Sequence, residues 1–104
     1  MKTLISSSGN NLDSSFDLRF GRAEWFCLLD EESGETSFHE NLYKEFSHGA
    51  GMKAVEKVIE LGATRVISGD FGPKVRKLLE KYNIQMVLLS DFSKSIADIA
   101  DSIK

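Results

Sequence analysis

The spacing of apolar residues along this chain changes several times between patterns typical of strands and patterns typical of helices. These changes predict five strands and three helices. Segments 2–7, 24–30 and 35–40 are apolar or alternating runs typical of strands, and the acidic turn around Gly34 joins the last two into a hairpin. Two later apolar or β-branched runs, 65–69 and 84–89, complete the set. The run 84–89 is apolar enough to predict a strand that is buried on both faces.

Helical periodicity dominates three further segments. Between residues 49 and 61, the apolar stripe is formed by Met52, Val55, Val58 and Ile59. Gly62 follows where a left-handed cap ends a helix. Pro73 suits the first turn of a second helix, which runs to Tyr82, and a third helix is predicted to start near Ser93.

The order of these elements predicts the fold class. A strand and a hairpin come first, and helices then alternate with strands, which is typical of crossover connections onto a parallel sheet. At 104 residues the chain has the length of one domain. We therefore expect a single domain over 1–104, an α/β fold with a mixed five-stranded sheet, about three helices and three layers.

The charge and composition of the chain argue against several classes of function. The net charge is -3 and the 13 Lys and Arg residues are scattered, so no basic stripe is available for nucleic acid. No apolar run is long enough for a membrane span or a signal peptide, which predicts a cytoplasmic protein. The single cysteine, Cys27, excludes an internal disulfide and cysteine-rich zinc sites within one chain, and its place in a predicted strand is typical of a buried, inert thiol.

Two glycine-rich junctions are the most informative candidates for binding. The segment 49–54 fits the loose dinucleotide pattern G-x-G-x-x-A, but the polar residues 43–48 precede it instead of the apolar strand that a dinucleotide fold requires. We interpret Gly49 and Gly51 as a helix start that admits an anion to backbone N–H groups. Gly69 and Gly72 form a second junction after a strand, and the two junctions are predicted to face one crevice. The alternative is that these glycines only permit tight turns.

Three side chains could add charge or coordination to such a crevice. His48 directly precedes the first junction and is a candidate metal ligand or donor to an anion, although a capping or loop histidine is the common alternative. Arg19 and Arg22 lie in the polar loop 8–22 and could grip an anion, or could serve solubility alone. No nucleophile with a neighbouring base is evident, which argues against an enzyme.

Four short motifs carry a family resemblance when their order and spacing are taken together. Residues 19–23 read RFGRA, 48–51 read HGAG, 66–73 read VISGDFGP and 84–86 read IQM. In this arrangement the chain resembles the dinitrogenase iron-molybdenum cofactor biosynthesis family, of the NifX, NafY and NifB C-terminal type, over nearly its whole length. The resemblance implies a three-layer ribonuclease H-like fold with a mixed five-stranded sheet.

The resemblance also implies a function. Proteins of this kind bind or carry iron-sulfur and molybdenum-containing clusters during cofactor assembly, and no hydrolytic activity is implied. By the resemblance, the histidine of the family's HGxG motif falls on His48, and its glycine loops fall on Gly49, Gly51, Gly69 and Gly72. Because the chain lacks a cysteine-rich region and an appended radical-enzyme domain, we expect it to store, deliver or sense a cluster and not to build one.

These observations lead to one prediction and two alternatives. We predict a non-enzymatic carrier that transiently binds an iron-sulfur or iron-molybdenum type cluster and meets a cofactor-assembly or acceptor protein. The predicted site is formed by Arg19, Arg22, His48, Gly49, Gly51, Gly69 and Gly72, with His48 as the metal ligand. The alternatives are a module that binds a phosphorylated small molecule or nucleotide at its helix N-termini, and a regulatory domain that binds a protein partner through the edge strand 35–40.

Overall fold

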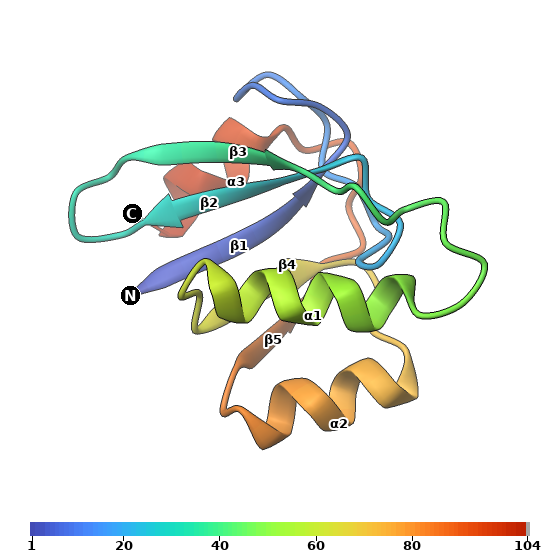
Figure 1. Cartoon of the computed structure of the whole chain (residues 1–104). Coiled ribbons are helices and arrows are strands. Elements are labelled where there is room, and N and C mark those ends of the chain that lie inside the picture. Colours follow the sequence, from blue (N-terminus) through green and yellow to red (C-terminus); the bar gives the residue numbers. More distant parts are fainter. Residues whose placement is uncertain (104) are drawn as a thin grey trace.

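Five strands form one mixed sheet in the computed structural model, which describes residues 1–103 (Figure 1). The central strand β1 (Lys2–Ser7) pairs antiparallel with β2 (Trp25–Asp30) and parallel with β4 (Arg65–Ser68). The edges are β3 (Thr36–Glu40), antiparallel to β2, and β5 (Gln85–Leu88), parallel to β4. The strand order is therefore β3-β2-β1-β4-β5, and the predicted mixed five-stranded sheet is confirmed.

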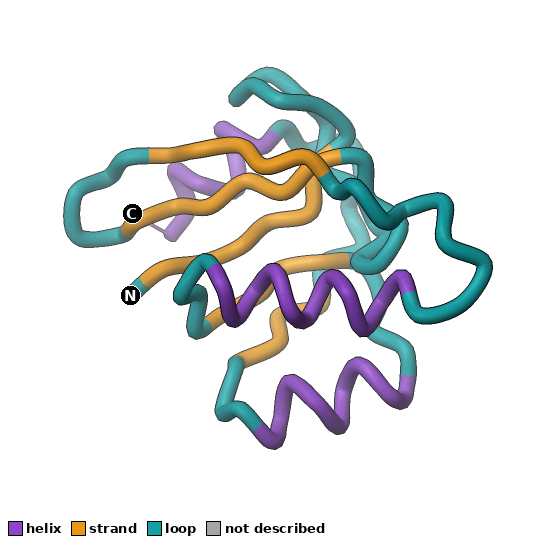
Figure 2. Tube along the Cα trace, viewed as in Figure 1, coloured by secondary structure: helices purple, strands orange, loops and turns teal. Residues whose placement is uncertain are grey.

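Three helices cover the two faces of this sheet. The helices α1 (Ala50–Glu60) and α2 (Pro73–Lys81) lie on one face, and α3 (Ile96–Ile103) lies on the other (Figure 2). This is the predicted three-layer α/β arrangement. Within residues 1–103, no helix is both long enough and apolar enough to cross a membrane.

Consecutive residues of the strands supply two separate cores. Leu4 and Phe26 belong to the core under α1 and α2, whereas their neighbours Ile5 and Cys27 belong to the core under α3. All four side chains are at most 1% exposed. Because side chains alternate between the faces of a strand, a short apolar run can serve both layers at once.

The start of α3 differs from the prediction. The helix begins at Ile96 and not near Ser93, because Ser95 caps it. The Asp98 backbone N–H donates to Ser95 Oγ at 3.1 Å, and the Ser95 N–H donates to Asp98 Oδ2 at 3.1 Å. This reciprocal pair is a capping box, which fixes the start of the helix.

The sheet edge corrects a second prediction. Strand β5 is not buried on both faces, since Gln85 and Leu88 are exposed and Leu88 retains 58% of its accessible surface. In the middle of the strand, Met86 and Val87 are partly buried and pack against the cores on the two faces. The buried stripe of α1 is shifted from the predicted one: Met52 and Ile59 are exposed, and Ala50 and Ala54 are buried together with Val55 and Val58.

A substitution at Phe20 tests the core on the α1 side. Its ring is 1% exposed and lies 5.5 Å from the ring of Phe71 and 6.1 Å from that of Phe26, measured between centroids. We expect Phe20→Ala to lower the free energy of unfolding by about 3–5 kcal/mol, because it leaves a cavity. Phe92→Ala is the control, because Phe92 is 68% exposed and should change stability by less than about 0.5 kcal/mol. Urea unfolding checks both, and equal effects would contradict this packing.

Candidate functional site

The N-termini of α1 and α2 point toward the same edge of the sheet. Strands β1, β4 and β5 are parallel to one another, so their carboxyl ends lie at that edge. The segments 19–24 and 41–49 gather there, at the right of Figure 1, beside the short connection 69–72. In open α/β sheets this edge is where ligands bind.

A crevice lies between these segments and the two helix N-termini. It consists of two adjoining hollows of about 320 and 450 Å³. Both hollows are lined by Gly49, Gly51, Gly72 and Val75. The first is also lined by Arg19, Phe20, Gly21, Arg22, Ala50 and Asp70, and the second by Met52, Pro73 and Lys74. The two glycine junctions therefore face one crevice.

The backbone supplies the first source of positive charge in the crevice. Gly49 and Gly72 are the N-cap residues of α1 and α2, and neither helix has a side-chain cap. The first helical bonds run from Lys53 N–H to the Gly49 carbonyl and from Arg76 N–H to the Gly72 carbonyl. The N–H groups that precede them in each first turn carry the positive end of the helix dipole, which favours an anion.

Arg19 reaches the crevice but its charge is already paired. Its Nε and Nη2 donate to Asp17 Oδ1 and Oδ2 at 3.1 and 3.0 Å, and its backbone N–H donates to Oδ1 at 2.9 Å. Asp17 is buried, and its hydrogen bonds and charge raise the pKa of Arg19 further above its ordinary value. Arg19 therefore serves first as the partner of a buried carboxylate.

Arg22 makes fewer side-chain hydrogen bonds than Arg19. One of its N–H groups donates to the Lys44 carbonyl at 2.6 Å, which leaves other donors of the guanidinium fork for a ligand. Asp70 is the acidic residue in the lining of the crevice. Its Oδ1 accepts a long hydrogen bond of 3.5 Å from the Phe20 N–H. Arg22 and the helix N-termini are thus the groups best placed to hold an anion.

Close backbone contacts explain two of the predicted glycines. A Cβ on Gly51 would lie 2.7 Å from Val75 Cγ2, so Gly51 lets the first turns of α1 and α2 touch. A Cβ on Gly69 would lie 2.6 Å from Leu18 Cα and the Leu18 carbonyl oxygen. Gly69 does not line the crevice, and its identity follows from this packing.

His48 is exposed and stands one residue before Gly49, but its side chain is not part of the crevice lining. In the described part of the chain, no group of three or more His, Cys, Asp or Glu side chains is arranged to hold a metal ion. Cys27 is buried in β2. Of the seven predicted site residues, the structure brings Arg19, Arg22, Gly49, Gly51 and Gly72 together, and it leaves His48 and Gly69 outside.

Comparison with known proteins assigns the chain to a family. A family model described as dinitrogenase iron-molybdenum cofactor matches residues 1–103. The chain belongs to this family. A search of curated proteins gave no match.

Two solved structures support the family's fold. The apo form of the orange protein from Desulfovibrio gigas is similar, with a TM-score of 0.89 and 26% identity over 96% of this chain and 83% of that one. An NMR structure of a Thermotoga protein provisionally described as NifB has a TM-score of 0.78 and 26% identity, over 97% of this chain and 84% of that one. The mixed sheet with three helices is therefore the fold that this chain shares with both structures.

Two residues that hold the RFGRA loop (residues 19–23) in place were missed by sequence reasoning. Asn41 is buried, and its Nδ2 donates to the carbonyls of Gly21 and Ala23 at 3.0 and 2.9 Å. Asp17 is the second, through the contacts with Arg19 described above. The Asp-x-Arg spacing was a readable signal for Asp17, whereas nothing local to residue 41 indicates which carbonyls it meets.

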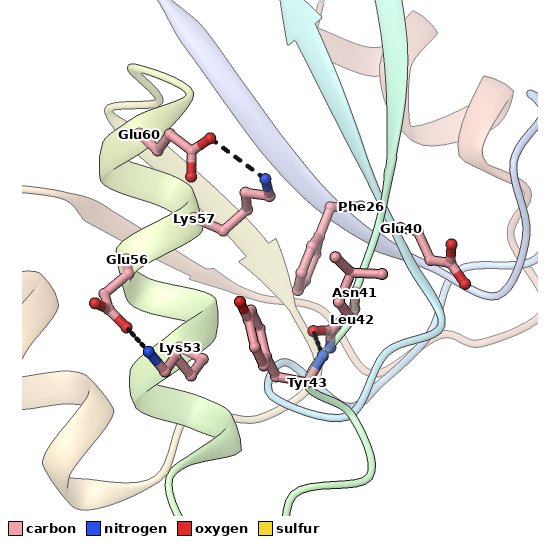
Figure 3. A pocket seen from close by; sticks show the side chains of 9 residues that line it. All are labelled: Phe26, Glu40, Asn41, Leu42, Tyr43, Lys53, Glu56, Lys57 and Glu60. Atoms are coloured by element: carbon pink, nitrogen blue, oxygen red, sulfur yellow. Dashed lines mark hydrogen bonds and ion pairs between the residues drawn. The ribbon is translucent and has the colours of Figure 1, made fainter.

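A further hollow, of about 180 Å³, lies between β3 and α1 (Figure 3). Lys53 and Lys57 line it, but they pair with Glu56 and Glu60 of the same helix at 3.4 and 3.5 Å. Glu40 adds a third carboxylate, so the lining holds more acidic than basic side chains. This hollow is a poorer anion site than the crevice.

A matched pair of substitutions in one connection tests the packing of the site. We expect Gly69→Ala to lower the free energy of unfolding by about 1–3 kcal/mol, because its Cβ collides with backbone that cannot move aside cheaply. Gly72→Ala should not destabilise, because a Cβ there meets nothing within 4 Å and φ is -63°. Thermal unfolding compares the two, and a larger loss at Gly72 would contradict the geometry.

Proposed function

We propose that this chain binds a preassembled anionic iron-sulfur or iron-molybdenum type cluster in the crevice and carries it without transforming it. The observation that supports the proposal best is the meeting of two uncapped helix N-termini and Arg22 in one crevice of a family member. The lining contains no serine, threonine, cysteine or histidine that could act as a nucleophile or its base. Binding, and not catalysis, is therefore the proposed role.

The donors of the crevice fit such a cargo. Sulfide and oxide atoms on the surface of a cluster accept hydrogen bonds, and backbone N–H groups and a guanidinium supply them. Met52, which is exposed, adds polarizable contact. Because no thiolate lines the crevice, the cluster would have to arrive assembled and stay bound through many weak contacts.

The roles of His48 and of a partner belong to this proposal. His48 is exposed at the start of α1, so its imidazole is open to a cluster that protrudes from the crevice. We infer that the recipient is a cofactor-assembly or acceptor protein, because a carrier needs a partner that takes its cargo. A phosphorylated small molecule is the second candidate, since the same uncapped N–H groups suit a phosphate.

Arg22 provides the first test of binding. The purified chain is incubated without oxygen with tetrathiomolybdate or an isolated iron-molybdenum-sulfur cluster, and retained metal is measured after gel filtration. We expect Arg22→Ala to weaken binding by about 10-fold or more, because it removes a charged hydrogen-bond donor. Arg22→Lys should recover part of the loss.

The control for Arg22 is Lys94→Ala, which removes an exposed positive charge from the segment before α3, outside the crevice lining. Equal losses in the Arg22 and Lys94 variants would show that only net charge matters. Retention of phosphate or a nucleotide, with no retained metal, would transfer support to the second candidate.

A substitution tests His48 separately. If its imidazole coordinates metal, His48→Ala should retain less metal than the parent at the same pH, whereas Arg22 and the helix N-termini are unchanged in it. His39→Ala is the control, because it removes the other histidine of the chain, which lies in β3 and outside the crevice lining. Identical retention by the parent and His48→Ala would remove His48 from the site and leave the crevice proposal intact.

A further inference from the structure

Strand β5 leaves main-chain groups open at one edge of the sheet. The N–H groups of Gln85 and Leu89 donate to backbone carbonyls of the segment 64–68 at 2.9 and 3.0 Å, so they face β4. Because successive residues of a strand direct their main-chain groups to opposite sides, those of Met86 and Leu88 face away from β4. β5 is the last strand in the sheet order, so these groups are available to an added strand.

This edge lacks the features that commonly prevent strand addition. Edge strands are often protected by a lysine, a proline or a bulge, whereas β5 reads QMVL and contains neither a charged residue nor a proline. Leu88, at its end, is 58% exposed, and Tyr82, three residues before its start, is 51% exposed. Apolar surface therefore lies at both ends of the open edge.

Helix α2 places an unbalanced positive charge beside the same edge. Figure 1 shows α2 beyond β5, on the side away from β4. Its exposed side chains include one anion, Glu80, and four cations, Lys74, Arg76, Lys77 and Lys81. Within the described residues no ion pair joins any of these four cations to a carboxylate, whereas other lysines of the chain are paired. The surface of α2 is therefore suited to acidic side chains.

The charge of α2 distinguishes between the possible occupants of the edge. A second copy that paired antiparallel through β5 would bring its own α2 to the same face of the joined sheet, so that cations would meet cations. An acidic segment of another protein would meet the cations favourably. Lys81 Nζ lies 5.9 Å from the centroid of the Tyr82 ring, which places one cation directly beside the apolar surface of the edge. A segment with both apolar and acidic side chains fits this combination.

We propose that the β5 edge is a docking site for an extended acidic segment of a partner protein, which adds to the sheet as a further strand. Main-chain hydrogen bonds to Met86 and Leu88 hold the segment, and Lys77 and Lys81 select its acidic side chains. This surface is separate from the crevice, whose lining includes neither Lys77 nor Lys81. The inference therefore does not depend on the proposed function.

The test uses an end-blocked peptide of alternating valine and glutamate, about eight residues long, as the probe for the full chain. Amide hydrogen exchange, measured by NMR, is a readout that surface attraction alone does not move. We expect exchange at the Met86 and Leu88 N–H groups to slow by about 10-fold or more in the complex, because both become hydrogen-bonded. The N–H of Val87 should change less, because it already faces β4.

Charge reversal tests the choice of an acidic partner. We expect the double variant Lys77→Glu with Lys81→Glu to bind the peptide about 10-fold or more weakly, and a peptide of alternating valine and lysine to bind the parent less tightly than the acidic one. The matched control is Lys2→Glu with Lys94→Glu, which changes the net charge equally at exposed positions outside α2 and β5. It should change binding by less than about threefold.

Each outcome has a separate meaning. Slower exchange at Met86 and Leu88 together with a preference for the acidic peptide supports the proposal. Binding without slower exchange at these two N–H groups overturns strand addition, and equal binding of the two peptides overturns the acidic partner. Slower exchange that appears without peptide as the protein concentration rises would assign the edge to a second copy and overturn the proposal. So would a parent that does not bind the acidic peptide at about 1 mM.

Discussion

The contact between the backbones of Gly21 and Gly51 is the constraint on which the crevice depends. A Cβ on Gly21 would lie 2.8 Å from Gly51 Cα, so the RFGRA loop and the first turn of α1 approach as closely as main chains can. Gly51 makes a second close contact, with Val75 at the start of α2. Three segments distant in sequence are thereby fixed around one point. Gly21 and Gly51 are therefore required for packing, and the shape of the site is a consequence of that packing.

Charge in the crevice is local and does not follow from the charge of the whole chain. The net charge is -3, yet two helix N-termini and two arginines meet at one end of the molecule. Asp17 is buried beside Arg19 and neutralises it, which also fixes the backbone between them through the Arg19 N–H. The field that an anion meets therefore comes mainly from oriented peptide groups and from Arg22, and these are in place before any ligand arrives.

The fold could be predicted from the sequence because periodicity and turn residues agree in almost every element. The predicted helix and strand boundaries lie within one residue of those in the structure, except at the start of α3. There the Ser95–Asp98 capping box fixes the first helical residue. Burial was harder, since a run such as 84–89 does not reveal that its strand lies at an edge. In the site, the sequence motifs identified most of the residues that line the crevice. The spacing of residues could not predict that Gly69 packs against the backbone of Leu18 and does not line the crevice. It also could not predict which backbone carbonyls the Asn41 side chain reaches.

A carrier has to release what it binds, and the crevice is built in a way that suits release. Backbone N–H groups and a guanidinium hold an anion through several hydrogen bonds, each of which can exchange with water one at a time. Thiolate ligation would instead tie each metal to a strong ligand whose removal requires another thiolate or protonation. Cys27, the single cysteine, is buried within β2 and away from the crevice lining. In the proposed carrier, multiple weak, preorganised contacts at an open surface would therefore reconcile retention of a charged cargo with its release.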